Sequence, residues 1–82
     1  MALRKSHTVT LTGLIIPAAW NADQEVAAVA LATADEKEYR LAVNRKGREL
    51  FGYLQHPVEV TGPLSQDEEG KMVIAVRSYT IK

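Results

Sequence analysis

Two histidines, three serines and one acidic run are the residues of this chain that could act in catalysis or hold a metal. His7 and His56 have no cluster of acidic or histidine ligands close to them, so the spacing of a zinc site is absent. Ser6, Ser65 and Ser78 lack the sequence context of a nucleophile elbow. No paired carboxylates fall on facing strand ends. These patterns predict neither a catalytic residue nor a metal ligand.

The acidic run at residues 67–69 resembles a calcium loop in charge alone, because it lacks the ordered oxygen ligands of an EF-hand. An acidic turn that keeps a hairpin soluble explains it better. Cysteine is absent, which excludes disulfides, thiolate metal sites and cysteine nucleophiles together. We therefore expect a protein that is not an enzyme and that has no cofactor.

Trp20 is the single tryptophan and falls in a predicted loop. A nucleic-acid or sugar binder uses such a ring as a stacking platform, since base stacking contributes roughly 1–3 kcal/mol per base. The alternative is that the ring folds over one end of the domain and covers apolar surface. The sequence leaves both interpretations open.

The densest basic group surrounds Gly47 and consists of Arg40, Arg45, Lys46 and Arg48. Backbone amides near Gly47, assisted by these cations, could bind a phosphate or a carboxylate. The alternative is a solvated turn with ordinary surface charges. The acidic turn at 65–70 and the zero net charge both count against nucleic acid as the main partner.

A second candidate surface is an apolar stripe made by alternate residues of one predicted strand. If Val26, Ala28 and Ala30 face outward, they form a flat apolar surface of the kind that marks protein contacts. The alternative is that a loop or the N-terminal tail covers this stripe.

The composition is that of one soluble globular domain spanning residues 1–82, with 46% hydrophobic and 24% charged residues. Ten basic residues balance ten acidic ones, so charge gives no general attraction to polyanions or membranes. No window approaches the ~20 apolar residues of a membrane helix. The opening residues carry charge without an apolar run, unlike a signal peptide, so we expect a cytoplasmic location by default.

Five stretches have the alternation or apolar runs of β-strands: residues 7–16, 25–33, 38–43, 58–64 and 71–81. A bend at Gly13 would let the first strand serve both sides of a barrel, and Pro17 is predicted to end it. The fifth strand is predicted to shift register, because its later apolar residues fall out of step with its earlier ones.

The second stretch is rich in alanine, which also favours a helix. It lacks a helical polar stripe, and a turn at 34–37 joins it to an alternating partner, so we predict a strand. In that partner Tyr39, Leu41 and Val43 are predicted to face inward. A short helix is predicted at 48–55, after a turn at 44–47, with an apolar face that plugs one end of the barrel.

Two segments resemble small bacterial domains of the oligonucleotide/oligosaccharide-binding (OB) fold. HPVEVTGPL at 56–64 looks like their fourth strand, and VIAVRSY at 73–79 looks like their closing strand. The resemblance implies a mainly β fold, namely a five-stranded antiparallel OB-type barrel with one short helix between strands three and four. An SH3-like barrel is the competing architecture. The implied binding surface lies over strands two and three, and the resemblance implies no particular ligand.

We therefore expect a non-catalytic binding module that recognises a protein, including a second copy of itself, through the strand-two face. The alternative is weak binding of single-stranded nucleic acid, or of a sugar, through Trp20 and the basic group. Monomer and dimer both fit the sequence, and no membrane contact is expected.

Overall fold

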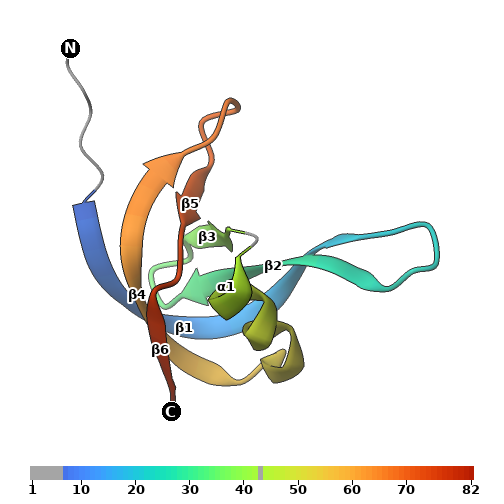
Figure 1. Ribbon diagram of the computed structural model, residues 1–82, viewed down its shortest axis with the longest axis horizontal. Helices are drawn as coiled ribbons and strands as arrows, with labels where there is room; N and C mark the ends of the chain where they lie inside the picture. The colour runs from blue at the N-terminus through green and yellow to red at the C-terminus, as the bar shows by residue number, and fades with distance from the viewer. Residues whose placement is uncertain (1–6, 43) are drawn as a thin grey trace.

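The computed structural model describes residues 7–42 and 44–82. Over this part of the chain the protein is mainly β, with six strands in one hydrogen-bonded sheet and a short helical segment (Figure 1). In chain order the elements are β1 His7–Trp20, β2 Val26–Thr33, β3 Glu38–Leu41, α1 Arg45–Glu49, η1 Leu50–Tyr53, β4 Pro57–Gln66, β5 Met72–Ile74 and β6 Ser78–Ile81. Here η1 is a short 3-10 segment that continues α1. Within these described residues, no helix has both the length and the apolar character needed to cross a membrane.

The strand pairings run in a closed cycle. β1 is antiparallel to β4 along its first half and to β2 along its second half. β2 is antiparallel to β3, β3 is parallel to β5, and β5 is antiparallel to β4. The order β1–β2–β3–β5–β4 therefore returns to β1. The outer part of the β1–β2 hairpin projects beyond the other strands, on the right of Figure 1.

One long strand, β1, serves two neighbours, as the glycine-bearing stretch predicts. Residues 7–14 pair with β4, and residues 13–20 pair with β2. A Cβ atom at Gly13 would collide with the backbone carbonyl of Ala32, so the close approach of β1 and β2 here requires glycine. The pairing of β1 with β2 starts at Gly13 and keeps one register as far as Pro17, so the irregularities lie beyond Pro17 and not at Gly13.

The prediction that Pro17 ends this strand is wrong. Pro17 pairs with Val29, and β1 continues to Trp20. The backbone N–H of Ile15 donates to the carbonyl oxygen of His56 at 3.3 Å, on the side of β1 away from β2. The nitrogen of Pro17, two residues further on, lies on that same side. Its missing N–H therefore removes no hydrogen bond to β2.

The helical segment begins three residues before the predicted range of 48–55, at the first residue of α1. Asn44 is the N-cap, because its Oδ1 accepts a hydrogen bond from the backbone N–H of Gly47 at 2.7 Å. The turn predicted at 44–47 is thus the cap and first turn of α1. Glu49, expected in the first helical turn, is the last residue of α1.

The alanine-rich segment is a strand, as predicted, and it contributes to the single core. Residues of β1, β3, β4, β5 and η1 also contribute to this core. Its members are Ile15, Val29, Leu31, Leu41, Leu50, Val58, Val60, Ile74 and Val76. Tyr39, Phe51 and Leu54 are partly buried and pack against it, whereas Val43, predicted to face inward, lies outside the described residues.

The predicted fifth strand at 71–81 is divided into two strands, so the sheet has six strands where the sequence predicts five. The predicted shift of register lies at this division. β5 and β6 both pair with β4, but one position out of step, and they are separated by residues 75–77. Gly62 on β4 faces this break and is buried. A Cβ atom at Gly62 would collide with the backbone carbonyl of Ala75. The break and the glycine together allow the chain to bend closely over β4.

Three hairpin turns share one backbone conformation. In each five-residue turn the first N–H donates to the fifth carbonyl, and the fourth N–H donates to the first carbonyl. This is a type I turn followed by a residue with positive φ. The residues with positive φ are Gln24 (66°), Glu36 (68°) and Gly70 (83°). The turns themselves are 21–25, 33–37 and 67–71.

Candidate functional site

A groove of about 380 Å³ crosses the sheet over β1, β2, β3 and the start of β5. Its lining is largely apolar, with three charged residues. The residues are Ile16, Pro17, Ala18, Ala30, Glu38, Arg40, Lys71 and Met72, and we call it the outer groove. It lies partly over the second and third strands, where the OB resemblance implies a binding surface.

The register of three strands places the outer groove on the face opposite the core. Ile16 on β1 pairs with Ala30 on β2, and Ala30 pairs with Arg40 on β3. Directly paired residues project from the same face of a sheet. The adjacent pair, Ile15 and Leu31, is fully buried in the core. Ile16, Ala30 and Arg40 therefore project outward together.

The apolar stripe predicted at Val26, Ala28 and Ala30 is divided between two faces. Ala30 lines the outer groove and is only 3% exposed, and Ala28 is partly buried. The register of β1 and β2 shifts twice in the outer hairpin, so that Ala18 and Ala27 have no direct partner in it. The second shift is a β-bulge at Ala27, and it reverses which residues of β2 point to each face of the sheet. Val26 consequently packs against the core cluster instead of lying beside Ala28.

Trp20, predicted to lie in a loop, is the last residue of β1. It pairs directly with Val26 and is 59% exposed. Because paired residues share a face, the indole lies on the side of the hairpin to which Val26 points. The residue is mostly open to solvent, which does not fit the predicted role of covering apolar surface, whereas the stacking role stays a prediction.

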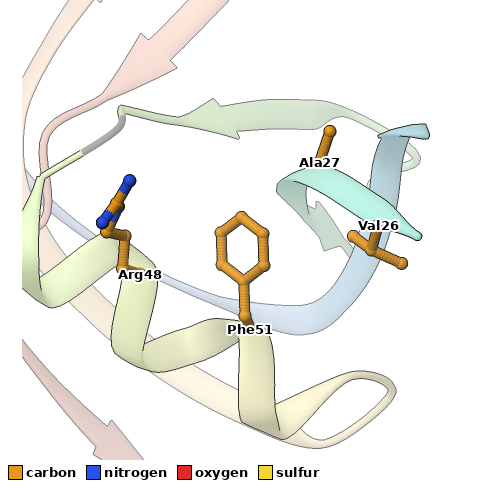
Figure 2. Close-up of a pocket in the computed structure, with 4 residues that line it drawn as sticks. All are labelled: Val26, Ala27, Arg48 and Phe51. Atoms are coloured by element: carbon orange, nitrogen blue, oxygen red, sulfur yellow. The ribbon is translucent and has the colours of Figure 1, made fainter. Parts of the chain in front are cut away.

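On that side, a hollow of about 350 Å³ separates the start of β2 from the helical segment. Its lining consists of Val26, Ala27, Arg48 and Phe51. Figure 2 shows Arg48 and Phe51 projecting side by side from the helical segment, with Val26 and Ala27 on the far side of Phe51 from Arg48. Arg48 also lines an adjoining hollow of about 680 Å³ with Asn44, Arg45 and Glu49. We call this the helix-side surface, comprising Trp20, Val26, Ala27, Phe51, Arg45 and Arg48.

The basic group identified in the sequence is spread over three places. Arg40 lines the outer groove, whereas Arg45 and Arg48 lie on the helix-side surface. Lys46 lies 5.8 Å from the centroid of the Tyr79 ring, a cation–π contact that directs it toward β6. Trp20 therefore shares a surface with two of the four cations.

Tyr79 also forms a hydrogen bond to the helical segment. Its hydroxyl donates to Oε1 of Glu49 at 2.7 Å. This hydrogen bond raises the pKa of Tyr79 from 10.0 to about 12, because ionisation of the phenol would break it beside a carboxylate. The contact joins β6 to α1 and occupies the carboxylate next to Arg48.

The acidic turn between β4 and β5 is ordered by its first carboxylate. Oδ1 of Asp67 accepts hydrogen bonds from the backbone N–H groups of Glu69 and Lys71, both at 2.9 Å. The bond from Lys71 is the main reason that the pKa of Asp67 lies below its ordinary value of 3.8, and the charge of Arg40 lowers it further. The positive charge of Arg40 is thus partly offset by the turn beside it.

The residues with metal-binding or catalytic potential lie apart. His56 contacts the edge of the Tyr53 ring, with the ring centroids 5.8 Å apart, and His7 is exposed at the start of β1. Among residues 7–42 and 44–82, no three His, Asp or Glu side chains are grouped to hold a metal ion. Comparison with protein-family models, with curated proteins and with solved structures finds no match for this chain.

Sequence reasoning did not identify several residues of these two surfaces. Ile16, Ala18 and Met72 of the outer groove and Phe51 of the helix-side surface are not among the binding residues that the sequence predicts. The alternation of strand residues could have identified Ile16, because it follows Ile15 directly and must point to the opposite face of the sheet. The positions of the remaining residues depend on the bulges in the β1–β2 hairpin and on where the helical segment packs. The pattern of polar and apolar residues in the sequence does not show either of these.

Proposed function

We propose that this chain is a small OB-type barrel that serves as a non-catalytic module for protein recognition through its outer groove. The closed cycle of pairings supports the barrel, because closure of a sheet removes its free edges. The order of elements, with α1 and η1 after β3 and before β4, also agrees with an OB-type barrel. The OB resemblance of residues 56–64 and 73–79 adds to this support.

The observation that carries the function is the composition of the outer groove. Ile16, Pro17 and Met72 supply apolar surface, and the small side chains of Ala18 and Ala30 keep the groove open. The apolar residues and the three charged residues of the lining together resemble a protein interface, in which an apolar centre is bordered by a polar rim. Larger residues in place of the alanines would fill the groove.

The charges around the groove favour a protein partner over a polyanion. Glu38 and Lys71 are exposed on either side, and Arg40 faces the acidic turn that begins at Asp67. Lys71 lies 3.8 Å from Glu69, an exposed pair that contributes little stability. This mixture of signs gives no continuous basic path for a phosphate backbone but suits the polar rim of a protein contact.

Weak binding of single-stranded nucleic acid is the alternative, and one observation favours it. Trp20 and Arg48 lie on the same side of the β1–β2 hairpin. Arg40 and Lys46 lie elsewhere, which leaves few cations to follow a backbone. A titration with a mixed-sequence oligonucleotide at about 50 and about 200 mM salt tests it, since phosphate contacts weaken steeply with salt.

Self-association is the first form of the proposal to test. Sedimentation velocity should compare the wild type with Ala28→Lys, which adds a charge on the outer face, and with Thr12→Lys, an exposed control on β1. If a second copy is the partner, Ala28→Lys abolishes dimer formation and Thr12→Lys preserves it. A dimer unaffected by Ala28→Lys contradicts recognition of a second copy through this face.

A further inference from the structure

We propose that the helix-side surface is a second, independent binding site, which takes an acidic peptide segment of a partner protein that carries one large apolar side chain. The site lies on the opposite face of β2 from the outer groove and shares none of its residues. It therefore goes beyond the function proposed above, and either site can fail without the other.

The apolar part of the site is a hollow that can take one large apolar side chain of a partner. Phe51 and Val26 form walls of a hollow of about 350 Å³ that opens beside the small side chain of Ala27. This volume lies within the usual range of small-ligand sites, roughly 300–1,000 Å³. Trp20, the most exposed large hydrophobic residue of the described chain, extends the same face outward.

The charged part of the site determines which peptide fits. Arg48 borders the apolar hollow, and Arg45 lies with it around the adjoining one. The ion pairs within the described residues join Lys71 to Glu69 and Lys82 to Glu59, so neither arginine is paired there. Glu49 lines the same hollow as the two arginines, and Oε1 of its carboxylate accepts the Tyr79 hydroxyl. Exposed Glu25 precedes Val26, so a partner's carboxylates must pair with Arg45 and Arg48 in the presence of these two acidic side chains.

The combination of a tryptophan, an arginine and an apolar hollow is typical of the residues that dominate protein interfaces. A nucleic acid would need cations along the path of several phosphates, whereas here two adjoin a single hollow. An apolar side chain flanked by carboxylates on a peptide complements both parts of the site. The attraction between exposed charges alone is weak, so the apolar anchor must supply most of the affinity.

An amide chemical-shift titration of the full chain with acetyl-Gly-Glu-Leu-Glu-Gly-amide tests this proposal. We expect saturable shifts at Val26, Ala27 and the Trp20 indole. Replacing the leucine by alanine should weaken binding about 50-fold, the effect of removing three buried carbon atoms. Replacing both glutamates by lysine, with the leucine kept, should weaken binding, because the lysines repel Arg45 and Arg48.

Arg48→Glu should weaken binding of the acidic peptide about tenfold and strengthen binding of the lysine peptide. Arg40→Glu, on the opposite face, is the matched control and should leave peptide binding unchanged while altering the outer groove. Absent shifts, equal binding of the lysine peptide, or equal loss with Arg40→Glu would overturn the proposal. Tighter binding of an oligonucleotide at the same residues, or dilution-dependent shifts there without peptide, would assign the surface to nucleic acid or to a second copy instead.

Discussion

Trp20 and Val26 are direct cross-strand partners at the outer end of the β1–β2 hairpin, and their side chains share the face that meets Phe51. Two residues further along β2, Ala28 lies on the opposite face. The two register shifts between Pro17 and Trp20 cause this change. A single strand therefore contributes to two separate surfaces, the outer groove and the helix-side surface.

The close approach of Gly62 to the backbone at Ala75 should make this position intolerant of any side chain. A Cβ atom there would collide with a backbone carbonyl, and backbone cannot move aside cheaply. We expect Gly62→Ala to lower the free energy of unfolding by about 2–3 kcal/mol in urea denaturation. Gly52→Ala is the control, because nothing lies within 4 Å of a Cβ at Gly52. Similar stabilities for the two variants would contradict the packing described here.

The shared conformation of the three hairpin turns predicts stabilising substitutions. Gln24 and Glu36 occupy positions with φ of 66° and 68°, where a non-glycine residue is strained by about 1–2 kcal/mol. Glycine removes the strain but loses more entropy on folding. We expect a net gain of about 0.5–1 kcal/mol for Gln24→Gly and for Glu36→Gly, measured by thermal unfolding. Gly70→Ala should show the reverse effect, and a gain from that variant would refute the assignment.

The N-cap at Asn44 should determine where α1 begins. Asn44→Ala removes the acceptor of the Gly47 N–H and should reduce the free energy of unfolding by about 1 kcal/mol. Asn44→Asp retains an acceptor and should retain most of the stability. Hydrogen exchange at the Gly47 amide gives a local readout, expected to accelerate in Asn44→Ala alone. Unchanged exchange in that variant would show that the cap contributes nothing.

The contact between Tyr79 and Glu49 predicts a pH dependence at high pH. The folded pKa of Tyr79 is raised to about 12 from 10.0, so the folded state holds the phenolic proton more tightly than the unfolded state does. The associated stability is present below pH 10 and is lost as the pH rises toward about 12. Ultraviolet titration of tyrosinate should show one late-titrating group that Glu49→Gln returns toward its ordinary pKa. A titration identical in both proteins would contradict the contact.

The strands could be predicted because apolar and polar residues alternate in most of them. Thr8, Thr10 and Thr12 against Val9 and Leu11 give a period that only a half-buried strand explains. The start of α1 was missed although Asn44 is a favoured N-cap residue, since the basic residues after it resembled a turn. Pro17 was misjudged because the side to which its nitrogen points depends on the neighbouring strands.

The candidate site could be predicted only in part, and the reason lies in the alanines. Alternation of polar and apolar residues shows which face of a strand each residue occupies. Residues 27 and 28 are both alanine, so they show no alternation. The bulge at Ala27 therefore leaves no trace in the pattern, and Val26 was placed with Ala30. The separation of Arg40 from Arg48 follows from tertiary packing, which sequence proximity does not reveal.

The central claim, recognition of a protein through the outer groove, is tested most directly by site-specific photo-crosslinking in the cells that make the protein. A diazirine amino acid should replace Ala18 in the groove or, as the control, exposed Thr12 outside it. The account predicts a discrete protein adduct from position 18, absent from position 12 and lost when Arg40→Glu is added. Nucleic-acid adducts, the same adducts from both positions, or none from position 18 would contradict it.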